Sequence, residues 1–170
     1  MGRVSGRSCI VTGAAQGIGR AIGEALLDEG ADVCFADINA GKVAKFAEAS
    51  QKRASAAGGR AIHAPVDVTD RATVQAMIAH TVDAFGKLDV KFNNAGVNKP
   101  MNFLDVTEEA LGSVDVLINN AGVMPTGHVH EEADEVTRRQ VEINVLGVIF
   151  GTKIALQRML PRRHGHIINT

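Results

Sequence analysis

Tyrosine and tryptophan are both absent from this sequence of 170 residues, and cysteine occurs only twice. Without tyrosine, no phenolic side chain can serve as the general acid or base of a catalytic site. Cys9 and Cys34 lie in short apolar segments that we expect to be buried strands, where cysteine behaves as a small hydrophobic residue. We therefore predict two free thiols and no disulfide, as is usual in a reducing compartment.

Strong net charge is also missing. The chain carries 18 Lys and Arg residues against 19 Asp and Glu residues, a formal net charge of −1, so its composition would attract neither nucleic acid nor an anionic membrane. Residues 1–7 have no apolar stretch after their basic residues, and no apolar run approaches the length that spans a bilayer. We expect a cytoplasmic protein that folds as one domain over residues 1–170.

The most informative stretch is Cys9–Gly23, CIVTGAAQGIGRAIG, in which an apolar strand leads through a glycine cluster into a helix. Gly13 suits the tight turn off the strand, Gly17 would let the backbone approach a pyrophosphate, and Gly19 would let the helix pack closely on the strand. The N-terminal N–H groups of the helix would then point at that phosphate. This spacing predicts a dinucleotide site, and a strand–turn–helix without a ligand is the alternative.

An acidic residue stands at the end of the next expected strand, where ribose recognition requires one. Asp37 closes the strand Asp32–Asp37 and lies 18 residues beyond Gly19, against the roughly 20 that are usual in dinucleotide-binding folds. Its carboxylate can accept hydrogen bonds from both ribose hydroxyls of NAD, and it would repel the additional phosphate of NADP. Residues 14–16 add no positive charge to attract that phosphate. We therefore predict NAD as the preferred cofactor.

Strand and helix patterns alternate along the chain, which predicts a doubly wound α/β fold with a parallel sheet and helices on both faces. The expected strands are Ser8–Thr12, Asp32–Asp37, Ala61–Val66, Leu88–Asn93 and His166–Thr170. The expected helices are Gly17–Glu29, Ala40–Ala57, Asp70–Phe85, a short one at Thr107–Leu111, and Glu131–Leu160. We expect Pro161 to prevent the last helix from continuing.

One segment of the chain occurs twice. Residues 86–97 (GKLDVKFNNAGV) recur 26 positions later as residues 112–123 (GSVDVLINNAGV), and the triplet Asp-Val-Thr occurs at Asp67–Thr69 and Asp105–Thr107. Two copies do not make a solenoid, which needs at least about three stacked units. We interpret the pattern as one duplicated strand-and-turn unit.

The two copies cannot occupy one position in a sheet. They can lie as adjacent parallel strands, giving the order 3-2-1-4-4′-5, because residues 98–111 just supply the crossover of about a dozen residues that parallel neighbours need. Alternatively, one copy is a surface loop, which would expose Val116, Leu117 and Ile118 at about 1.5–3 kcal/mol each. We favour the additional strand. Only one Asn-Asn-Ala-Gly turn could then line a cofactor well.

Four motifs together resemble the classical short-chain dehydrogenase/reductase family: Thr12-Gly13-x-x-x-Gly17-x-Gly19, Asp67-Val68, the Asn-Asn-Ala-Gly turns, and Ile143-Asn144-Val145. The resemblance covers essentially the whole chain. It implies a Rossmann-like fold and reversible hydride transfer between a nicotinamide cofactor and a secondary alcohol or carbonyl. It assigns to cofactor binding Gly13, Gln16, Gly17, Ile18 and Gly19 in the glycine loop, Asp37 at the adenosine ribose, Asp67 and Val68 at the adenine, and either Asn94, Ala95 and Gly96 or Asn120, Ala121 and Gly122 at the nicotinamide-side ribose.

The resemblance also indicates what catalysis would lack. The family uses a pair spaced Tyr-x-x-x-Lys together with a serine, and the tyrosine exchanges a proton with the substrate oxygen. This sequence has no tyrosine, and the serine would follow the strand His166–Thr170. Asn144 matches the family's helix asparagine, which holds a water in the proton relay. We expect a truncated cofactor-binding portion that binds NAD, weakly, and has no turnover unaided.

The duplication departs from the family, which has one such unit. A full helix, Asp70–Phe85, precedes the first copy as the family requires, and the long helix Glu131–Leu160 follows the second. Each copy thus has one of its two family neighbours. We interpret the chain as two family members joined at a seam near residues 105–112, and an ordinary member with a long insertion that happens to look alike is the alternative.

Two other functions compete with the oxidoreductase. The last strand would be an exposed edge and the long helix is apolar nearly all round, so we expect self-association, as a homo-oligomer of the oxidoreductase or as the sole function of a non-enzymatic module. A recombined or incomplete product with no evolved function is the third alternative. His128-x-His130 and His164-x-His166 lack a third ligand at metal-site spacing, so we predict no metal site.

Overall fold

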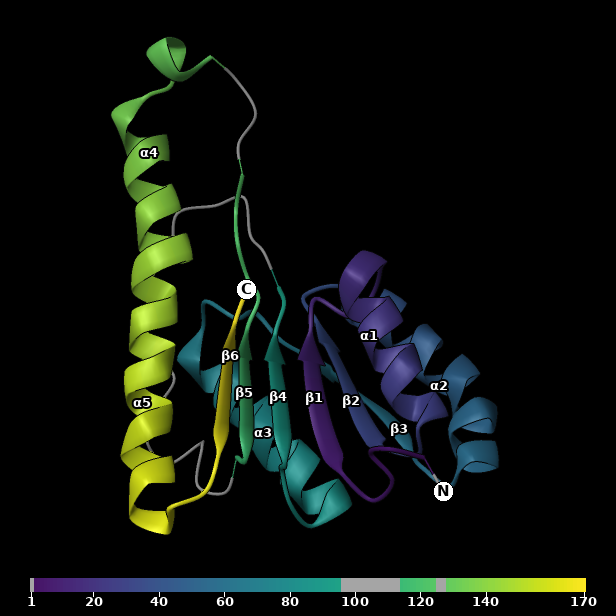
Figure 1. The fold of residues 1–170 in the computed structure, drawn as a ribbon. Coiled ribbons are helices and arrows are strands. Elements are labelled where there is room, and N and C mark those ends of the chain that lie inside the picture. The colour runs from purple at the N-terminus through teal and green to yellow at the C-terminus, as the bar shows by residue number, and fades with distance from the viewer. Residues whose placement is uncertain (1, 96–113, 125–127) are drawn as a thin grey trace.

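The computed structural model of the chain describes residues 2–95, 114–124 and 128–170. Within them, six parallel strands form one sheet in the order β3-β2-β1-β4-β5-β6, and helices cover both of its faces (Figure 1). The strands are β1 (Ser8–Thr12), β2 (Asp32–Asp37), β3 (Ala61–Pro65), β4 (Val90–Asn93), β5 (Val116–Asn119) and β6 (His166–Asn169). The predicted doubly wound, Rossmann-like fold is confirmed.

Helices pack on the two faces of the sheet because strand residues alternate between them. The helices are α1 (Gly17–Asp28), α2 (Ala40–Ala57), α3 (Arg71–Phe85), a 3-10 turn at Val129–Glu131, α4 (Asp134–Val141) and α5 (Gly147–Arg162), with a π-helical turn at Glu142–Leu146 between the last two. Phe35 of β2 belongs to one core cluster, with Leu27 of α1 and Val43 of α2. Its neighbour Cys34 belongs to the other, with Met77 of α3. Both cysteines are buried and free, as predicted.

The long C-terminal helix differs most from the sequence expectation. It begins at Asp134 because residues 129–131 form a separate 3-10 turn. It then continues through Pro161 to Arg162. The prediction that the proline would end the helix at Leu160 is therefore wrong. Arg163 adopts a left-handed conformation with φ 54°, which stops the helix there. Pro161 therefore lies in the last turn of α5, one residue before the helix ends at Arg162.

The remaining boundaries shift by one or two residues from the predicted ones. The differences are a strand start at Val90 in place of Leu88, a helix end at Asp28 in place of Glu29, a helix start at Arg71 with Asp70 as its cap, and strand ends at Pro65 and Asn169 in place of Val66 and Thr170. Terminal residues of helices and strands fray, which accounts for differences of this size. The helix predicted at residues 107–111 and the crossover at residues 98–111 lie outside the described residues.

The duplicated units form adjacent parallel strands, as we favoured. β4 and β5 pair in the register that sets each residue opposite its own copy, from Val90 beside Val116 to Asn93 beside Asn119. Leu117 is buried against Ala155 and Met159 of α5. The alternative of an exposed loop is therefore wrong, because the second copy is an interior strand between β4 and β6.

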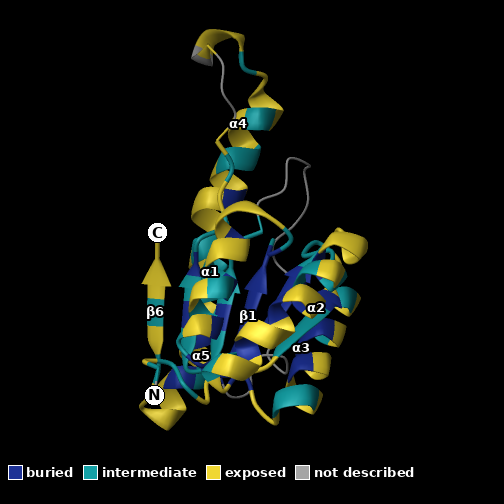
Figure 2. Cartoon of the chain, turned by 90° about the vertical axis from the view of Figure 1, so that its right-hand side faces the viewer, coloured by how far each residue is buried: buried dark blue, intermediate teal, exposed yellow. Residues whose placement is uncertain are grey.

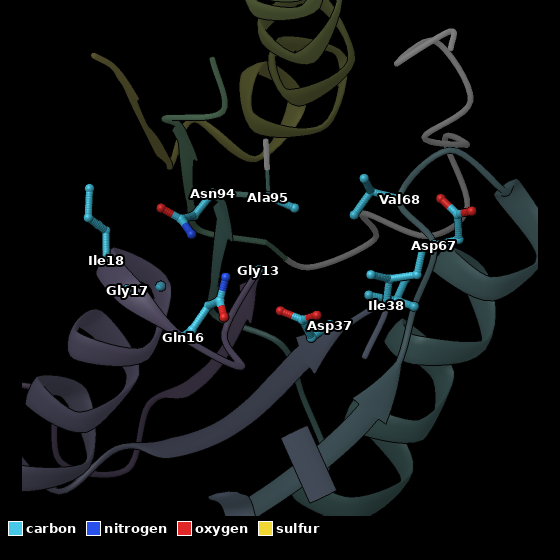
Figure 3. A pocket seen from close by; sticks show the side chains of 12 residues that line it. Gly13, Gln16, Gly17, Ile18, Asp37, Ile38, Asp67, Val68, Asn94 and Ala95 are labelled. Carbon is cyan, nitrogen blue, oxygen red and sulfur yellow. The ribbon is translucent and has the colours of Figure 1, made fainter. Parts of the chain in front are cut away.

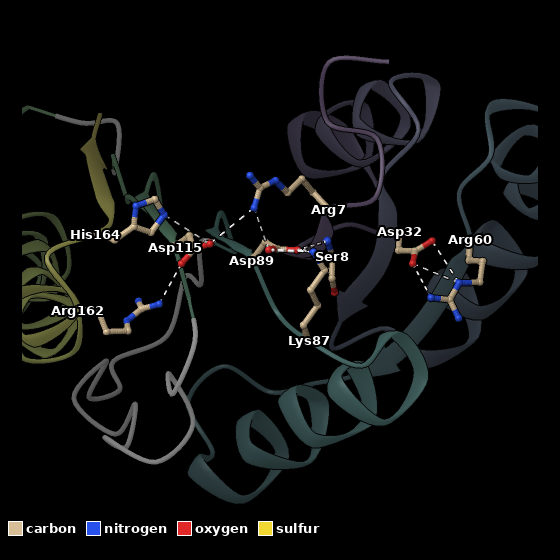
Figure 4. A network of polar contacts seen from close by, with 9 residues as sticks. All are labelled: Arg7, Ser8, Asp32, Arg60, Lys87, Asp89, Asp115, Arg162 and His164. Carbon is tan, nitrogen blue, oxygen red and sulfur yellow. Dashed lines mark hydrogen bonds and ion pairs between the residues drawn. The ribbon is translucent and has the colours of Figure 1, made fainter. Parts of the chain in front are cut away.

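Asp89 and Asp115, which occupy the same position in the two copies, form ion pairs at the amino ends of the strands (Figure 4). Asp89 accepts a hydrogen bond from the Ser8 backbone N–H at 2.8 Å and pairs with Arg7 at 3.1 Å and Lys87 at 2.8 Å. Burial alone would raise the pKa of Asp89, but these three partners hold it below its ordinary value. The copy, Asp115, pairs with Arg162 at 3.0 Å and also with Arg7, at 3.7 Å. Arg7 thus links the two copies, and Arg162 ties the second copy to the end of α5.

The strand β6 and the helical segment beside it are the most exposed parts of this architecture. β6 forms an edge of the sheet, and Figure 2 shows most of it exposed. Among the described residues, Asp134–Arg162, 29 residues long, is the one helix whose length and composition would allow it to cross a bilayer. This corrects the expectation that no apolar run is long enough to span a bilayer. Length and composition alone are weak grounds for a membrane span, and Ala155 and Met159 of this helix pack on the sheet.

Among the residues that the structure describes, one lysine is buried in the core. Lys91 of β4 lies between Ile10 of β1 and Leu117 of β5 in the sheet and is 2% exposed. Burial lowers the pKa of Lys91 to about 8, because an apolar environment disfavours the charged amine. The folded chain therefore releases this proton at lower pH than the unfolded chain does, so burial of Lys91 opposes folding fully below pH 8 and less and less between pH 8 and 10.5.

We predict that Lys91→Leu, which places the residue of the second copy in the first, raises the free energy of unfolding at pH 7 by roughly 3 kcal/mol. The gain should shrink as the pH rises from 8 toward 10.5, because the folded wild type then holds a neutral amine. Urea denaturation at pH 7 and pH 10 measures both values. The exposed Lys52→Leu is the control, and an equal gain in both variants, or a gain that does not depend on pH, would contradict the prediction.

Candidate functional site

A cavity of about 380 Å³ opens at the carboxyl ends of β1, β2 and β3, beside the turn that follows β4 (Figure 3). This is the point where the strand order reverses, and ligands of open α/β sheets bind at such switch points. The lining residues are Gly13, Gln16, Gly17, Ile18, Gly19, Asp37, Ile38, Val66, Asp67, Val68, Asn94 and Ala95. Ten of these are residues that the sequence predicted for cofactor binding.

Two glycines shape the loop between β1 and α1. A Cβ on Gly19 would lie 2.4 Å from the carbonyl oxygen of Gly13 and 2.5 Å from Nδ2 of Asn94, so only glycine allows α1 to begin this close to β1 and β4. Gly17 has φ 58°, and a Cβ there would meet nothing within 4 Å. Its backbone therefore presents a bare surface to the cavity, where a ligand can approach.

The start of α1 is suited to an anion. Gln16 makes no side-chain cap bond, and the first turn contains no acidic residue. The first N–H groups of a helix have no partner within it, and the helix dipole places partial positive charge there. The residues present therefore fit a phosphate-bearing ligand at residues 17–19.

Asp37, the last residue of β2, is held in place beside the glycine loop. Its two carboxylate oxygens accept hydrogen bonds from the backbone N–H groups of Ala15, at 3.0 Å, and Asn39, at 2.9 Å. Ile38, 68% exposed, lies beside it in the cavity wall. A carboxylate fixed in this way needs no rearrangement before it accepts hydrogen bonds from a ligand.

Asp67 and Val68 line the far side of the cavity, after β3. The carboxylate of Asp67 accepts hydrogen bonds from the backbone N–H and the hydroxyl of Thr69, and the hydroxyl of Thr73 donates to the Asp67 carbonyl at 2.8 Å. The side chain of Asp67 is thus engaged within its own turn. Val68 supplies an apolar surface on this side of the cavity.

The turn after β4 is hydrogen-bonded to the end of β1. The N–H groups of Asn94 and Ala95 both donate to Oγ1 of Thr12 at 3.1 Å, and Nδ2 of Asn94 donates to the Thr12 carbonyl at 3.0 Å. The Thr12 hydroxyl in turn donates to the Phe92 carbonyl at 3.2 Å. Asn94 and Ala95 are therefore fixed against the strand from which the glycine loop begins.

A model of the family described as short chain dehydrogenase matches residues 7–111 and, in a second match, residues 101–170. The chain belongs to the short-chain dehydrogenase family. One relative, the oxidoreductase UcpA of Salmonella typhimurium, is 32% identical over 168 residues, which are 99% of this chain and 52% of the relative. Another, 2,5-dichloro-2,5-cyclohexadiene-1,4-diol dehydrogenase of Sphingobium indicum, is 34% identical over 171 residues, 100% of this chain and 56% of the relative.

A solved structure with the same fold is a short chain dehydrogenase from Burkholderia cenocepacia J2315 in complex with NADP. It has a TM-score of 0.57 and 27% sequence identity, and the match covers 98% of this chain and 56% of that one. This chain therefore spans about half the length of the curated relatives that it matches. The resemblance read from its motifs is confirmed as family membership.

Family membership does not indicate which copy of the Asn-Asn-Ala-Gly turn lies at the cavity, but the topology does. β4 pairs with β1, so Asn94 and Ala95 of the first copy line the cavity. In the second copy, Asn120, Ala121 and Gly122 lie within the described part of the chain and are not among the lining residues. Gly96 lies outside the described residues. The roles assigned to all these residues remain predictions.

Asn144, the family's helix asparagine, is found in the π-helical turn. Its Oδ1 accepts a hydrogen bond from the Val123 N–H, and its Nδ2 donates to the Val123 carbonyl, both at 2.9 Å. π-Turns inside α-helices are frequent at functional sites. In this chain, the asparagine is bound to the turn of the second copy and is not among the residues that line the cavity.

Sequence reasoning missed Ile38 and Val66 in the cavity wall. Each is the immediate neighbour of a predicted residue, Asp37 or Asp67, at the carboxyl end of a strand, and that position was the available signal. Among the described residues, no group of three or more His, Cys, Asp or Glu side chains could hold a metal ion.

We predict that Gly19→Ala lowers the free energy of unfolding by about 1–3 kcal/mol, the usual cost of adding a methyl group to a packed contact. The new methyl would meet Gly13 and Asn94 at sub-van der Waals distances. Urea denaturation measures the change. The control is Gly41→Ala in α2, where a Cβ meets nothing within 4 Å. Equal stability of Gly19→Ala and wild type would contradict the packing described for this loop.

Proposed function

We propose that this chain is the cofactor-binding portion of an NAD-dependent oxidoreductase that transfers hydride between a nicotinamide and a secondary alcohol or carbonyl. The observation that carries the proposal is the cavity itself, which is lined by both the start of α1 and the fixed carboxylate of Asp37. Membership of the short-chain dehydrogenase family and the NADP in the Burkholderia cenocepacia enzyme support a nicotinamide dinucleotide as the ligand.

The lining residues divide naturally among the parts of such a ligand. The N–H groups at residues 17–19 would hold the pyrophosphate, and Asp37 would accept hydrogen bonds from the adenosine ribose. Ile38 and Val68, in the cavity wall, would offer apolar surfaces to the adenine, and Asn94 and Ala95 would face the nicotinamide ribose. Once bound, the nicotinamide would supply the hydride-transfer chemistry.

We propose that NAD is preferred over NADP. None of the twelve lining residues, all of them in the described part of the chain, is Lys or Arg, and Asp37 places negative charge where the additional phosphate of NADP would lie. The NADP of the Burkholderia cenocepacia enzyme argues in the other direction, so the preference rests on Asp37 and on the lack of Lys and Arg among the lining residues.

We predict that NADH binds at least tenfold more tightly than NADPH, and that Asp37→Ser weakens NADH binding about 10- to 100-fold while narrowing the gap between the two. The variant loses the charge-assisted hydrogen bonds from Asp37 to the ribose. It also loses the repulsion between the Asp37 carboxylate and the additional phosphate of NADPH. Titration of the cofactor's fluorescence at one ionic strength measures the four dissociation constants, those of NADH and NADPH for wild type and for Asp37→Ser. Asp83→Ser, on the exposed side of α3, removes the same charge far from the cavity. Tighter binding of NADPH, or no binding of either cofactor to folded protein, would overturn the proposal.

We also propose that the chain does not turn over substrate unaided. The sequence contains no tyrosine, so the family's proton donor to the substrate oxygen is absent. Asn144 alone cannot replace it, because a carboxamide does not act as a general acid or base near neutral pH. Sustained oxidation of NADH by this chain with a small ketone would contradict this part of the proposal.

Self-association is supported by the outer face of the C-terminal helical segment. Val141, Val145, Ile149, Leu156 and Leu160 are all exposed large apolar residues. Their spacings of four and seven residues place them on one face of the helix. We propose that a second copy of the chain covers this face, which makes the protein a homo-oligomer. A non-enzymatic self-associating module would use the same surface, and its association would not depend on NAD.

We predict that wild-type protein sediments as a dimer or larger species at micromolar concentration and that Ile149→Lys shifts it to monomer. A buried lysine at the interface would need desolvation, which opposes association. Gln157→Lys adds the same charge on another side of the helix and should leave the mass unchanged. A monomeric wild type, or equal effects of the two variants, would contradict the proposal.

The origin of the duplicated strand belongs to the proposal as well. We propose that two members of the family are joined in one chain near residues 105–112. The two ranges matched by the family model overlap at residues 101–111, which supports this position. The register of β4 and β5, each residue beside its own copy, fits two strands of one ancestry.

A further inference from the structure

A run of side-chain hydrogen bonds crosses the carboxyl ends of four strands beside the cavity. The hydroxyl of Thr170, which follows β6, donates to Oδ1 of Asn120 at 2.9 Å. Nδ2 of Asn120 donates to Oδ1 of Asn94 at 3.0 Å, and Nδ2 of Asn94 donates to the Thr12 carbonyl at 3.0 Å. The run therefore connects the edge of the sheet to the strand that carries the glycine loop.

The direction of these bonds fixes the orientation of the Asn94 amide. An asparagine offers an acceptor on one side of its amide and donors on the other. Asn120 donates to the acceptor of Asn94, which leaves the donor of Asn94 for the Thr12 carbonyl. With the amide turned over, the oxygen of Asn94 would face a carbonyl oxygen and its nitrogen would face the nitrogen of Asn120. The Thr12 carbonyl, which can only accept, selects this orientation, and Asn120 supports it by donating to Oδ1 of Asn94.

The orientation of Asn94 matters because its amide lies against the glycine loop. Nδ2 of Asn94 would be 2.5 Å from a Cβ on Gly19 and 3.2 Å from one on Gly13. The same residue lines the cavity, next to Ala95. The Asn94 amide is therefore packed closely against the start of α1, where the pyrophosphate of a dinucleotide would bind.

We infer that Asn120, although it belongs to the second copy of the turn and lies outside the cavity, is a positioning residue for cofactor binding in the first copy. It holds Asn94 in the orientation that shapes the glycine loop. The second turn thereby acts as a support for the first and makes no cofactor contact of its own. This inference rests on the proposed binding of a nicotinamide dinucleotide.

The neighbouring residue of the same strand provides an internal contrast. Asn119 belongs to a second run, in which its Nδ2 donates to Oδ1 of Asn169 at 2.9 Å. It packs beneath α5, where a Cβ on Gly151 would lie 2.9 Å from its Oδ1. Successive residues of a strand point to opposite faces. The run through Asn169 is therefore separate from the cavity, and a substitution at Asn169 controls for changes at this edge of the sheet.

The first test is a double-mutant cycle on NADH affinity with Asn120→Ala and Asn94→Ala. We expect Asn120→Ala to weaken NADH binding about tenfold in the wild-type background, which corresponds to the loss of one neutral hydrogen bond. In the Asn94→Ala background it should have no further effect, because the residue that it orients is gone. An equal effect in both backgrounds would overturn the inference, and so would unchanged affinity accompanied by a lower melting temperature.

An isosteric substitution sharpens the test. Asn120→Asp replaces the donor to Asn94 by an acceptor and should weaken NADH binding at least as much as Asn120→Ala. Asn169→Asp introduces the same charge at the same edge but keeps the acceptor for Asn119, and should bind NADH within about twofold of wild type. Equal weakening in the two Asp variants would show a charge effect and would overturn the inference.

Amide hydrogen exchange of residues 13–19 without cofactor separates this inference from the proposed function. Asn120→Ala should accelerate exchange there, and Asn169→Asp should not, because only the first loosens Asn94. If wild type fails to bind NADH while exchange responds as expected, the proposed function fails and the positioning role stands. If exchange at residues 13–19 is unchanged in Asn120→Ala, the positioning role fails whatever the affinity.

Discussion

The hydrogen bonds between the end of β1 and the turn after β4 hold the candidate site together. Thr12 accepts the N–H groups of Asn94 and Ala95 on its hydroxyl, and its carbonyl accepts the Asn94 side chain. The glycine loop begins at the next residue, so these bonds fix one wall of the cavity relative to the other. Gly19 completes the arrangement, because the absence of a Cβ lets α1 start in contact with both strands.

The second copy of the unit adds a strand, β5, beyond the contact between β1 and the turn after β4. β5 stands between β4 and β6, which moves α5 and Asn144 one strand spacing, about 4.8 Å, further from β1 than a single copy would place them. The first copy is hydrogen-bonded to the end of β1, and the second is hydrogen-bonded to the C-terminal helix through Val123 and Asn144. The two turns therefore contact different parts of the chain.

Much of this arrangement could be predicted from the sequence. The apolar run Val116-Leu117-Ile118 favoured an additional strand over a loop, and the glycine spacing with Asp37 located the cavity. Which turn lines the cavity could not be predicted, because both turns read Asn-Asn-Ala-Gly and only the pairing of β4 with β1 distinguishes them. The bond from Asn120 to Asn94 and the π-turn at Asn144 depend on side-chain geometry between distant segments, for which the sequence carries no local signal.

A crystal structure of the chain grown with NAD tests the central claim most directly. The account predicts the pyrophosphate at the N-terminus of α1, the adenosine ribose against the carboxylate of Asp37, and the remaining half of the dinucleotide beside Asn94 and Ala95. A dinucleotide bound at the second turn, beside Asn120 and Ala121, would contradict it. So would a cavity that stays empty at saturating NAD.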